Sequence, residues 1–193
     1  NDVVQLISDH SGHADLTVAW YLPEIVMHER QFQMRKRGSD LLPSIQKMEK
    51  LLGHNLNITE SVIESSVKEA IERQIQDHNI QLFHLAIDKV DWSRIMLDAV
   101  YRRPPFEVSE KEKGFRDAVI AEAFLQIVAL SPSTPKICRV VLVTGDRLLQ
   151  EAVRTRTKDC TNVMILANHE ELKGLINTLV AKVGEEFVAK IQE

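Results

Sequence analysis

The sequence has few cysteines and no long apolar run, and both deficits narrow the class of protein. Only Cys138 and Cys160 occur among 193 residues, and their spacing is not that of a metal-binding motif. Two isolated thiols are typical of reduced side chains in a cytosolic protein. No stretch approaches the roughly 20 apolar residues that a membrane span requires, and no secretory leader is visible. We therefore expect a cytoplasmic protein without a membrane partner.

Glycine-rich and nucleophile motifs are also missing, which removes several enzyme classes. The sequence contains no GxGxxG, no Walker loop and no Ser-His-Asp order, so dinucleotide binding, P-loop chemistry and acyl transfer lack support. There is no basic excess either, because 28 Asp and Glu outnumber 24 Lys and Arg and the net charge is −4. Overall charge thus does not indicate nucleic-acid binding, although a bound cation would reverse the local charge of clustered carboxylates.

The length and the order of apolar segments predict one α/β domain. A chain of 193 residues that is 44% hydrophobic can bury one substantial core, and we expect a single domain over 1–193. Alternating strands and helices favour a three-layer α/β/α sandwich with a central, mainly parallel sheet. A long helical segment interrupts this order and predicts a helical insertion at about 40–90. The expected strands are 16–22, 139–144 and 163–166, and the expected helices of the insertion are 41–52 and 61–84, the second opened by a capping box at Ser61.

An acidic side chain interrupts the apolar face of one predicted helix. Ile120, Phe124 and Ile127 recur three and four residues apart, which is the spacing of a buried helix face. Asp117 lies three residues before Ile120 and therefore on the same face. A charge directed at a core is costly unless a cation, a metal or hydrogen-bond donors accompany it. Asp117 is thus a candidate site residue.

Two further carboxylates occupy comparable positions. Asp146 follows the apolar run 139–144 and so stands at the carboxyl end of a predicted strand, where ligands bind in open α/β sheets. Glu29 shares a helix face with Ile25 and Phe32, and we expect it to point inward. Taken singly, Asp146 is more typical of a helix N-cap, and Glu29 is as typical of an ion pair with arginine. Together, three such carboxylates on separate elements predict a divalent-cation site.

Four segments occur in an order that suggests a family. In these segments the chain resembles PIN-domain nucleases, and in particular a subgroup with a helical insertion and a Pro-Pro-Phe segment. The two segments that contain Gly-Phe-Arg-Asp-Ala-Val-Ile and Thr-Gly-Asp are the more specific ones, and the resemblance spans about 16–166. The segments are LPEIVMHE (22–29), RPPF (103–106), KGFRDAVIAE (113–122) and VTGD (143–146).

The resemblance implies a metal-dependent nuclease that hydrolyses phosphodiester bonds with Mg²⁺ or Mn²⁺. It implies acidic ligands at Glu29, Asp117 and Asp146, with Glu122 as a further candidate because the subgroup often carries an acid there. Glu122 lies about 140° around the helix axis from Asp117, so a surface or structural role is equally open. Thr144 would orient Asp146 or the attacking water, or would only finish the strand.

The first acid of the family has no clear counterpart in this sequence. That acid normally ends an opening strand within an Asp-Thr-Asn motif. If Asn1 is the third member of the motif, the first acid lies before the sequence shown. The other alignment makes Asp2 the first acid and a metal ligand, but Val4 then occupies the position expected for asparagine.

Basic side chains flank the predicted ligands and suggest the polymer that the protein binds. Positive charge beside carboxylates suits a groove that follows a nucleic-acid backbone, and we expect single-stranded RNA, with single-stranded DNA as the other option. Any one cluster is as typical of a solvated surface. The candidate nucleic-acid contacts are Arg116 and Arg147, each next to a predicted ligand, and Lys113, Arg102 and Arg103.

Another functional class stays open. With an incomplete set of acids, a PIN-like module would bind RNA or act as a protein-interaction scaffold through its helical insertion. An inhibitory or scaffolding protein partner and an oligomer are compatible with either class. His10 and His13 could hold a metal, but their Ser, Gly and Asp neighbours favour a polar loop.

Overall fold

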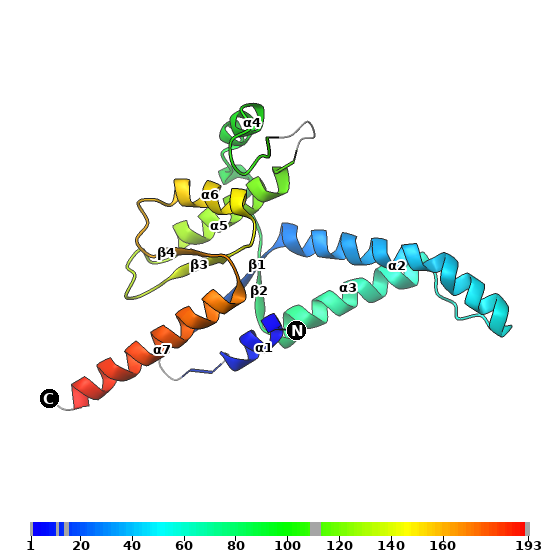
Figure 1. Ribbon diagram of the computed structural model, residues 1–193, viewed down its shortest axis with the longest axis horizontal. Coiled ribbons are helices and arrows are strands. Elements are labelled where there is room, and N and C mark those ends of the chain that lie inside the picture. Colours follow the sequence, from blue (N-terminus) through cyan, green and yellow to red (C-terminus); the bar gives the residue numbers. More distant parts are fainter. Residues whose placement is uncertain (1, 11, 14–15, 109–112, 192–193) are drawn as a thin grey trace. The chain divides into compact units, whose positions relative to one another are not determined.

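The computed structural model describes residues 2–10, 12–13, 16–108 and 113–191, and their elements form two compact units (Figure 1). Unit 1 comprises 1–20 and 84–193, and unit 2 comprises 21–83. Unit 1 contains α1 (Asp2–Asp9), η1 (Ile87–Lys89), α4 (Trp92–Val100), α5 (Phe115–Leu130), β3 (Val140–Val143), α6 (Arg147–Arg156), β4 (Val163–Leu166) and α7 (His169–Ile191). Unit 2 contains β1 (Trp20–Pro23), α2 (Glu24–Leu52), α3 (Glu60–Asp77) and β2 (Ile80–Phe83). The first residue of β1, Trp20, belongs to unit 1.

The centre of unit 1 is a parallel pair of strands covered by helices. β3 and β4 pair in register from Val140 opposite Val163 to Val143 opposite Leu166, which confirms the predicted parallel arrangement. α6 connects the two strands, as a parallel crossover requires. In Figure 1 α5 and α6 lie on one side of the pair, and α7 leaves from the end of β4 on the other. The main core joins these layers through Ala121, Phe124, Val140, Leu149 and Val153.

A second core cluster supports the beginning of α5. It is formed by Val90, Ile95, Phe106 and Ala118, and Phe106 is only 1% exposed. Full burial of a phenylalanine removes a large apolar area from water, so this contact stabilises the packing of α4 and the following turn on α5. The side-chain amide of Gln126 adds a polar connection, because it both donates to and accepts from the backbone of residue 86 at 2.9 Å.

Unit 2 is a helical hairpin attached to a two-stranded sheet. α2 and α3 pack along each other, and Gly38 permits their close approach, since a Cβ there would lie 2.6 Å from Cγ2 of Ile63. Arg35 and Glu64 join the helices by an exposed ion pair at 2.8 Å. No described residue of α2 is buried, and Phe32 is 57% exposed. The inward direction expected for the face of Ile25 and Phe32 stays a prediction.

Several predicted helix boundaries in unit 2 were wrong. The helix expected over 61–84 ends at Asp77, because Asn79 adopts a positive φ of 49° that breaks the helix, and Ile80–Phe83 then forms β2. Its N-cap is Thr59, whose side chain accepts from the Val62 N–H, and not the predicted Ser61. The helix expected over 41–52 is the second half of one long helix, α2.

In the described part of the chain, the strands form two two-stranded sheets, β1 with β2 and β3 with β4. The strand expected over 16–22 is shorter and shifted, at Trp20–Pro23, and its neighbour β2 was not predicted as a strand. The α/β class is as predicted. Within the described ranges, no helix combines the length and apolar character needed to cross a membrane.

A histidine pair follows the end of α1, and one of its members, His10, is buried. Nδ1 of His10 lies 2.7 Å from Nε2 of His13, and His10 is 6% exposed. Burial lowers the pKa of His10, and His13 and Lys173 of α7 lower it further, while Asp9 acts in the opposite direction. The neutral form of His10 is thus favoured in the folded protein. The predicted polar loop at these residues is in fact partly buried at His10.

We expect the protein to lose stability as the pH falls below about 6.5. The pKa of His10 is lowered from 6.5 in the folded state, so the unfolded chain takes up the proton more readily. The stabilisation is complete above the unfolded pKa and is lost as the pH falls towards the folded one. Urea unfolding at a series of pH values should show this decline in the wild type and a shallower one in His10→Gln. His54→Gln, at an exposed histidine of unit 2, is the matched control, and equal slopes in all three proteins would contradict the expectation.

Candidate active site

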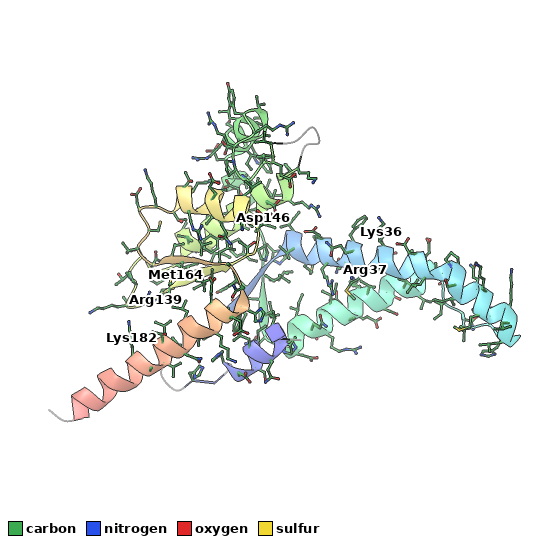
Figure 2. All side chains as sticks on the ribbon, viewed as in Figure 1. Lys36, Arg37, Arg139, Asp146, Met164 and Lys182 are labelled. Carbon is green, nitrogen blue, oxygen red and sulfur yellow. The ribbon has the colours of Figure 1, made fainter. Side chains whose placement is uncertain are left out.

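Asp146 stands where β3 gives way to α6. It is the N-cap residue of α6, and its Oδ1 accepts a hydrogen bond from the Leu149 N–H at 2.8 Å. Figure 2 labels Asp146 at one end of β3 and Arg139 at the other. The side chain is exposed, and a role as a ligand would fall to Oδ2. The capping function that its sequence position suggested is therefore present, and it leaves one carboxylate oxygen for other contacts.

Thr144 and Gln150 fix the turn that carries Asp146. The Thr144 N–H donates to the carbonyl of Leu166 at 3.0 Å, which extends the ladder between β3 and β4. Oγ1 of Thr144 accepts from the Asp146 N–H at 3.2 Å, and the Thr144 carbonyl accepts from the buried side chain of Gln150 at 2.6 Å. Thr144 therefore orients the backbone of Asp146.

Asp117 occupies the first turn of α5, and a close backbone contact sets where this helix starts. The preceding Gly114 has φ 116°, a conformation that favours glycine. A Cβ on Gly114 would lie 2.6 Å from the Pro105 carbonyl oxygen and 2.7 Å from Cα of Phe106, so no other residue fits there without displacement. Ala118, directly after Asp117, is buried against Phe106. The Pro-Pro-Phe turn thus determines the position of Asp117, which is itself half-buried.

Asp117 and Asp146 belong to the same edge of unit 1. α5 ends at Leu130, near the amino ends of the strands, because the side chain of Asn162 just before β4 donates to the Pro132 carbonyl at 2.8 Å. α5 therefore begins towards the carboxyl edge, where α6 also begins after β3 (Figure 1). Negative charge is favourable at a helix N-terminus, so both positions suit carboxylates.

Glu122 has a buried partner within unit 1. Its side chain is 4% exposed and forms an ion pair with Arg156 of α6, whose side chain is 21% exposed. The arginine satisfies the charge that burial would otherwise make costly. A ligand role for Glu122 would have to compete with this pair.

The remaining predicted ligands lie in other parts of the chain. Glu29 is on α2 of unit 2, where its Oε1 accepts from Gln33 at 3.2 Å. Asp2 is the first residue of α1, its side chain lies outside the part that the structure describes, and Asn1 lies outside the described residues. The convergence of Glu29 with Asp117 and Asp146 stays a prediction.

The predicted nucleic-acid contacts divide into two groups. Arg116 and Arg147 are exposed residues of the first turns of α5 and α6, and thus accompany the two acids. The others are engaged with or buried among neighbours: Lys113 pairs with Glu107 at 3.2 Å, Arg103 pairs with Asp98 at 3.8 Å, and Nη1 of Arg102 is buried.

The donors at the carboxyl edge are of the kind that Mg²⁺ or Mn²⁺ prefers. Oδ2 of Asp146 and the half-buried carboxylate of Asp117 are hard oxygen donors, so the residues present fit such an ion. Among the described residues, no three His, Cys, Asp or Glu side chains form a group that could hold a metal. A hollow of about 200 Å³ lies between α4, α5 and α6, with Arg94, Arg103 and Arg156 in its lining, but neither acid lines it. Both acids of the candidate site therefore lie outside this hollow.

Sequence reasoning missed the residues that hold this edge in place. Gln150 lies four residues after Asp146 on the buried face of α6, and a polar residue on such a face was a detectable signal. Arg156 gave no comparable signal, because its partner Glu122 is 34 residues away in the sequence. Phe106 was noted as part of a motif, but its burial was not predicted.

Comparison with known families supports the resemblance. A family model described as PIN domain matches residues 13–148, which is more than half of the chain. The chain belongs to the PIN-domain family. No curated protein and no solved structure showed significant similarity to it. The match includes the segments that carry Glu29, Asp117 and Asp146.

Family membership supplies the general chemistry. PIN domains are generally nucleases, they typically use divalent metal ions, and PIN nucleases generally bind nucleic acids. The match does not distinguish the subgroup with a helical insertion.

We expect the pair of Glu122 and Arg156 to be structural in this PIN domain. Arg156→Met should lower the free energy of unfolding by about 3 kcal/mol, because it leaves a buried carboxylate without its counter-charge. The double variant with Glu122→Gln should recover part of the loss, as measured by urea denaturation. Arg154→Met, at an exposed arginine of the same helix, is the control, and equally small losses at both positions would argue against the structural role.

Proposed function

We propose that this PIN domain is a metal-dependent nuclease that hydrolyses phosphodiester bonds in single-stranded RNA or DNA, with RNA as the main substrate. The observation that carries the proposal is the placement of Asp117 in the first turn of α5 and of Asp146 at the N-cap of α6, two helices that begin at the carboxyl edge of β3. Two carboxylates at one edge, each beside an exposed arginine, suit an ion and a phosphate backbone together.

In the proposed site, Asp117 and Asp146 hold Mg²⁺ or Mn²⁺, and Glu29 completes the set from unit 2. The divalent ion would supply Lewis acidity that makes a water molecule nucleophilic at neutral pH and would stabilise charge on the phosphate oxygens. Asp2 is the candidate for a fourth ligand. Glu122 is assigned to its pair with Arg156, because ligation would leave the half-buried guanidinium group of Arg156 less well compensated.

The other residues position the acids and the substrate. Thr144 and Gln150 hold the turn at Asp146 by hydrogen bonds. Oδ1 of Asp146 caps α6, and Oδ2 of Asp146 would bind the metal ion. Arg116 and Arg147 would bind phosphate groups of the strand. These contacts involve the backbone and not base edges, so little sequence preference is expected.

The proposal also covers the arrangement of the two units, a protein partner and the cell compartment. Both units would form one PIN domain of three α/β/α layers, with the α2–α3 hairpin as its helical insertion. The exposed apolar residues of that hairpin would accept an inhibitory or scaffolding protein. Two free, half-buried cysteines are consistent with action in the cytoplasm.

We expect loss of either acid's charge to abolish cleavage without unfolding the protein. Asparagine keeps an N-cap acceptor, so Asp146→Asn should retain the bond to the Leu149 N–H while losing the ligand charge. Asp117→Asn and Asp146→Asn should each reduce the Mn²⁺-supported cleavage rate by at least roughly a hundredfold, or ~2.7 kcal/mol of barrier. The thermal midpoints should fall by no more than a few degrees.

Matched controls separate catalysis from folding in this experiment. Glu29→Gln should cause the same loss if unit 2 contributes its carboxylate, and Asp159→Asn, at an exposed aspartate elsewhere in unit 1, should retain activity. EDTA should stop cleavage by the wild type. Activity that persists in EDTA would refute the metal-dependent mechanism, and binding without cleavage would indicate the non-catalytic RNA-binding module.

We expect Arg147 to contribute to substrate binding more than to chemistry. In the Asp117→Asn background, which prevents cleavage, Arg147→Ala should weaken binding of single-stranded RNA and reduce the slope of log affinity against log salt by about 1. Arg139→Ala is the matched control, because Arg139 is an exposed arginine at the opposite end of β3 (Figure 2). Fluorescence anisotropy would measure both, and equal effects would show that phosphate contacts are not concentrated at the acidic edge.

A further inference from the structure

The hollow between α4, α5 and α6 has an apolar floor, and all of its lining belongs to unit 1. The buried residues of the lining include Phe106, Ala118, Ala121 and Ala152, none of which has a polar side-chain atom. Small-molecule sites are of this kind, mostly apolar with a few polar groups that fix the orientation of the ligand. The floor therefore suits a flat apolar group better than a hydrated ion.

The side of the hollow at α4 carries positive charge. Arg94 and Arg103 both line the hollow, and their guanidinium groups lie 3.5 and 3.8 Å from the carboxylate of Asp98. Because two cations share one carboxylate, an excess of positive charge is left on this side. Glu151 lies across the hollow on α6, and Arg156 is engaged with Glu122. An anionic group would therefore be attracted to the α4 side.

α5 and α6 connect the hollow to the acidic edge. Arg147, Glu151 and Thr155 follow one another at intervals of four residues and so share one face of α6. Glu151 and Thr155 line the hollow, and Ala118 of its floor comes directly after Asp117 on α5. A nucleic-acid strand bound at Arg147 would thus meet the hollow within two helical turns along the same face of α6.

A nucleotide matches both sides of the hollow, because it joins a flat ring to a negative charge. An apolar cavity of about 150 Å³ accepts benzene, so a hollow of about 200 Å³ has room for one base. We propose that the hollow binds a base of the single-stranded RNA substrate, with the adjoining phosphate at Arg94 and Arg103. This inference rests on the function proposed above and adds a base subsite beside the acidic edge.

The floor also determines what kind of selectivity the subsite has. Its side chains present no donor or acceptor to the edge of a base, so a base would be held by apolar contact with its ring face. Every base offers such a face, and binding of this kind tolerates different sequences. The subsite is therefore expected to raise affinity without adding a strong sequence preference.

Filling the hollow should weaken binding of a strand that has bases, but not of a strand that lacks them. Thr155 is exposed at the rim, and a tryptophan there can cover the apolar floor without replacing a buried residue. In the Asp117→Asn background, Thr155→Trp should raise the dissociation constant of a short oligouridylate at least about fivefold, as loss of one stacked base would. Its affinity for an abasic strand of the same length should not change. Fluorescence anisotropy would measure both strands.

Thr178→Trp is the matched control for this substitution. Oγ1 of Thr178 on α7 donates to the Gly174 carbonyl at 2.8 Å, just as Oγ1 of Thr155 donates to the Glu151 carbonyl at 2.9 Å. Both threonines are exposed, so the two variants lose the same kind of bond and gain the same ring. Only Thr155→Trp places that ring at the hollow, and circular dichroism would confirm that both variants are folded.

Arg94→Gln tests the phosphate contact separately. Arg103 still pairs with Asp98 in this variant, so the fold should be kept. Binding of both strands should weaken, and the slope of log affinity against log salt should fall by about 1. Arg139→Gln, at an exposed arginine before β3, should leave the slope unchanged. Equal slopes in the two variants would overturn the phosphate contact.

The outcomes distinguish the base subsite from the nuclease function. Oligouridylate affinity that Thr155→Trp leaves unchanged or raises would overturn the subsite, as would an equal loss in Thr178→Trp or with the abasic strand. If the wild-type chain cleaves RNA in Mn²⁺ under any of these results, only the subsite fails. If Thr155→Trp weakens oligouridylate binding as expected but the wild type cleaves nothing, only the nuclease function fails. A chain that binds neither strand would overturn both.

Discussion

The close contact between Gly114 and the Pro105–Phe106 backbone is the constraint on which the candidate site depends. Phe106 is buried between α4 and α5, and Gly114 lets the chain pass within van der Waals distance of it before α5 begins. The position of Asp117 follows from where that helix starts. Packing of α5 on β3 through Phe124 then places the same helix start at the edge where Asp146 ends β3. The close fit between Gly114 and the Pro105–Phe106 backbone thus sets the start of α5, and with it the edge at which Asp117 lies.

The carboxylates of unit 1 lie in two different electrostatic environments. Asp117 lies in the first turn of α5 and Asp146 is the N-cap of α6, where the aligned peptide dipoles favour negative charge. Glu122 lies deeper, where burial makes an unpaired charge costly, and Arg156 is its counter-charge. Acids only five residues apart on one helix are therefore suited to different functions.

The elements that were predicted correctly are those whose sequence signal lies within a few neighbouring residues. The apolar runs at β3 and β4, the helix that carries Asp117 and the turn at Asp146 were predicted because periodicity and strand ends are encoded within a few residues. The strand β2 was missed because a helix-like pattern extends up to a break set by the backbone of Asn79. At α2, periodicity shows which residues share a face, not whether that face has a neighbour. Long-range partners such as Arg156 leave no local pattern.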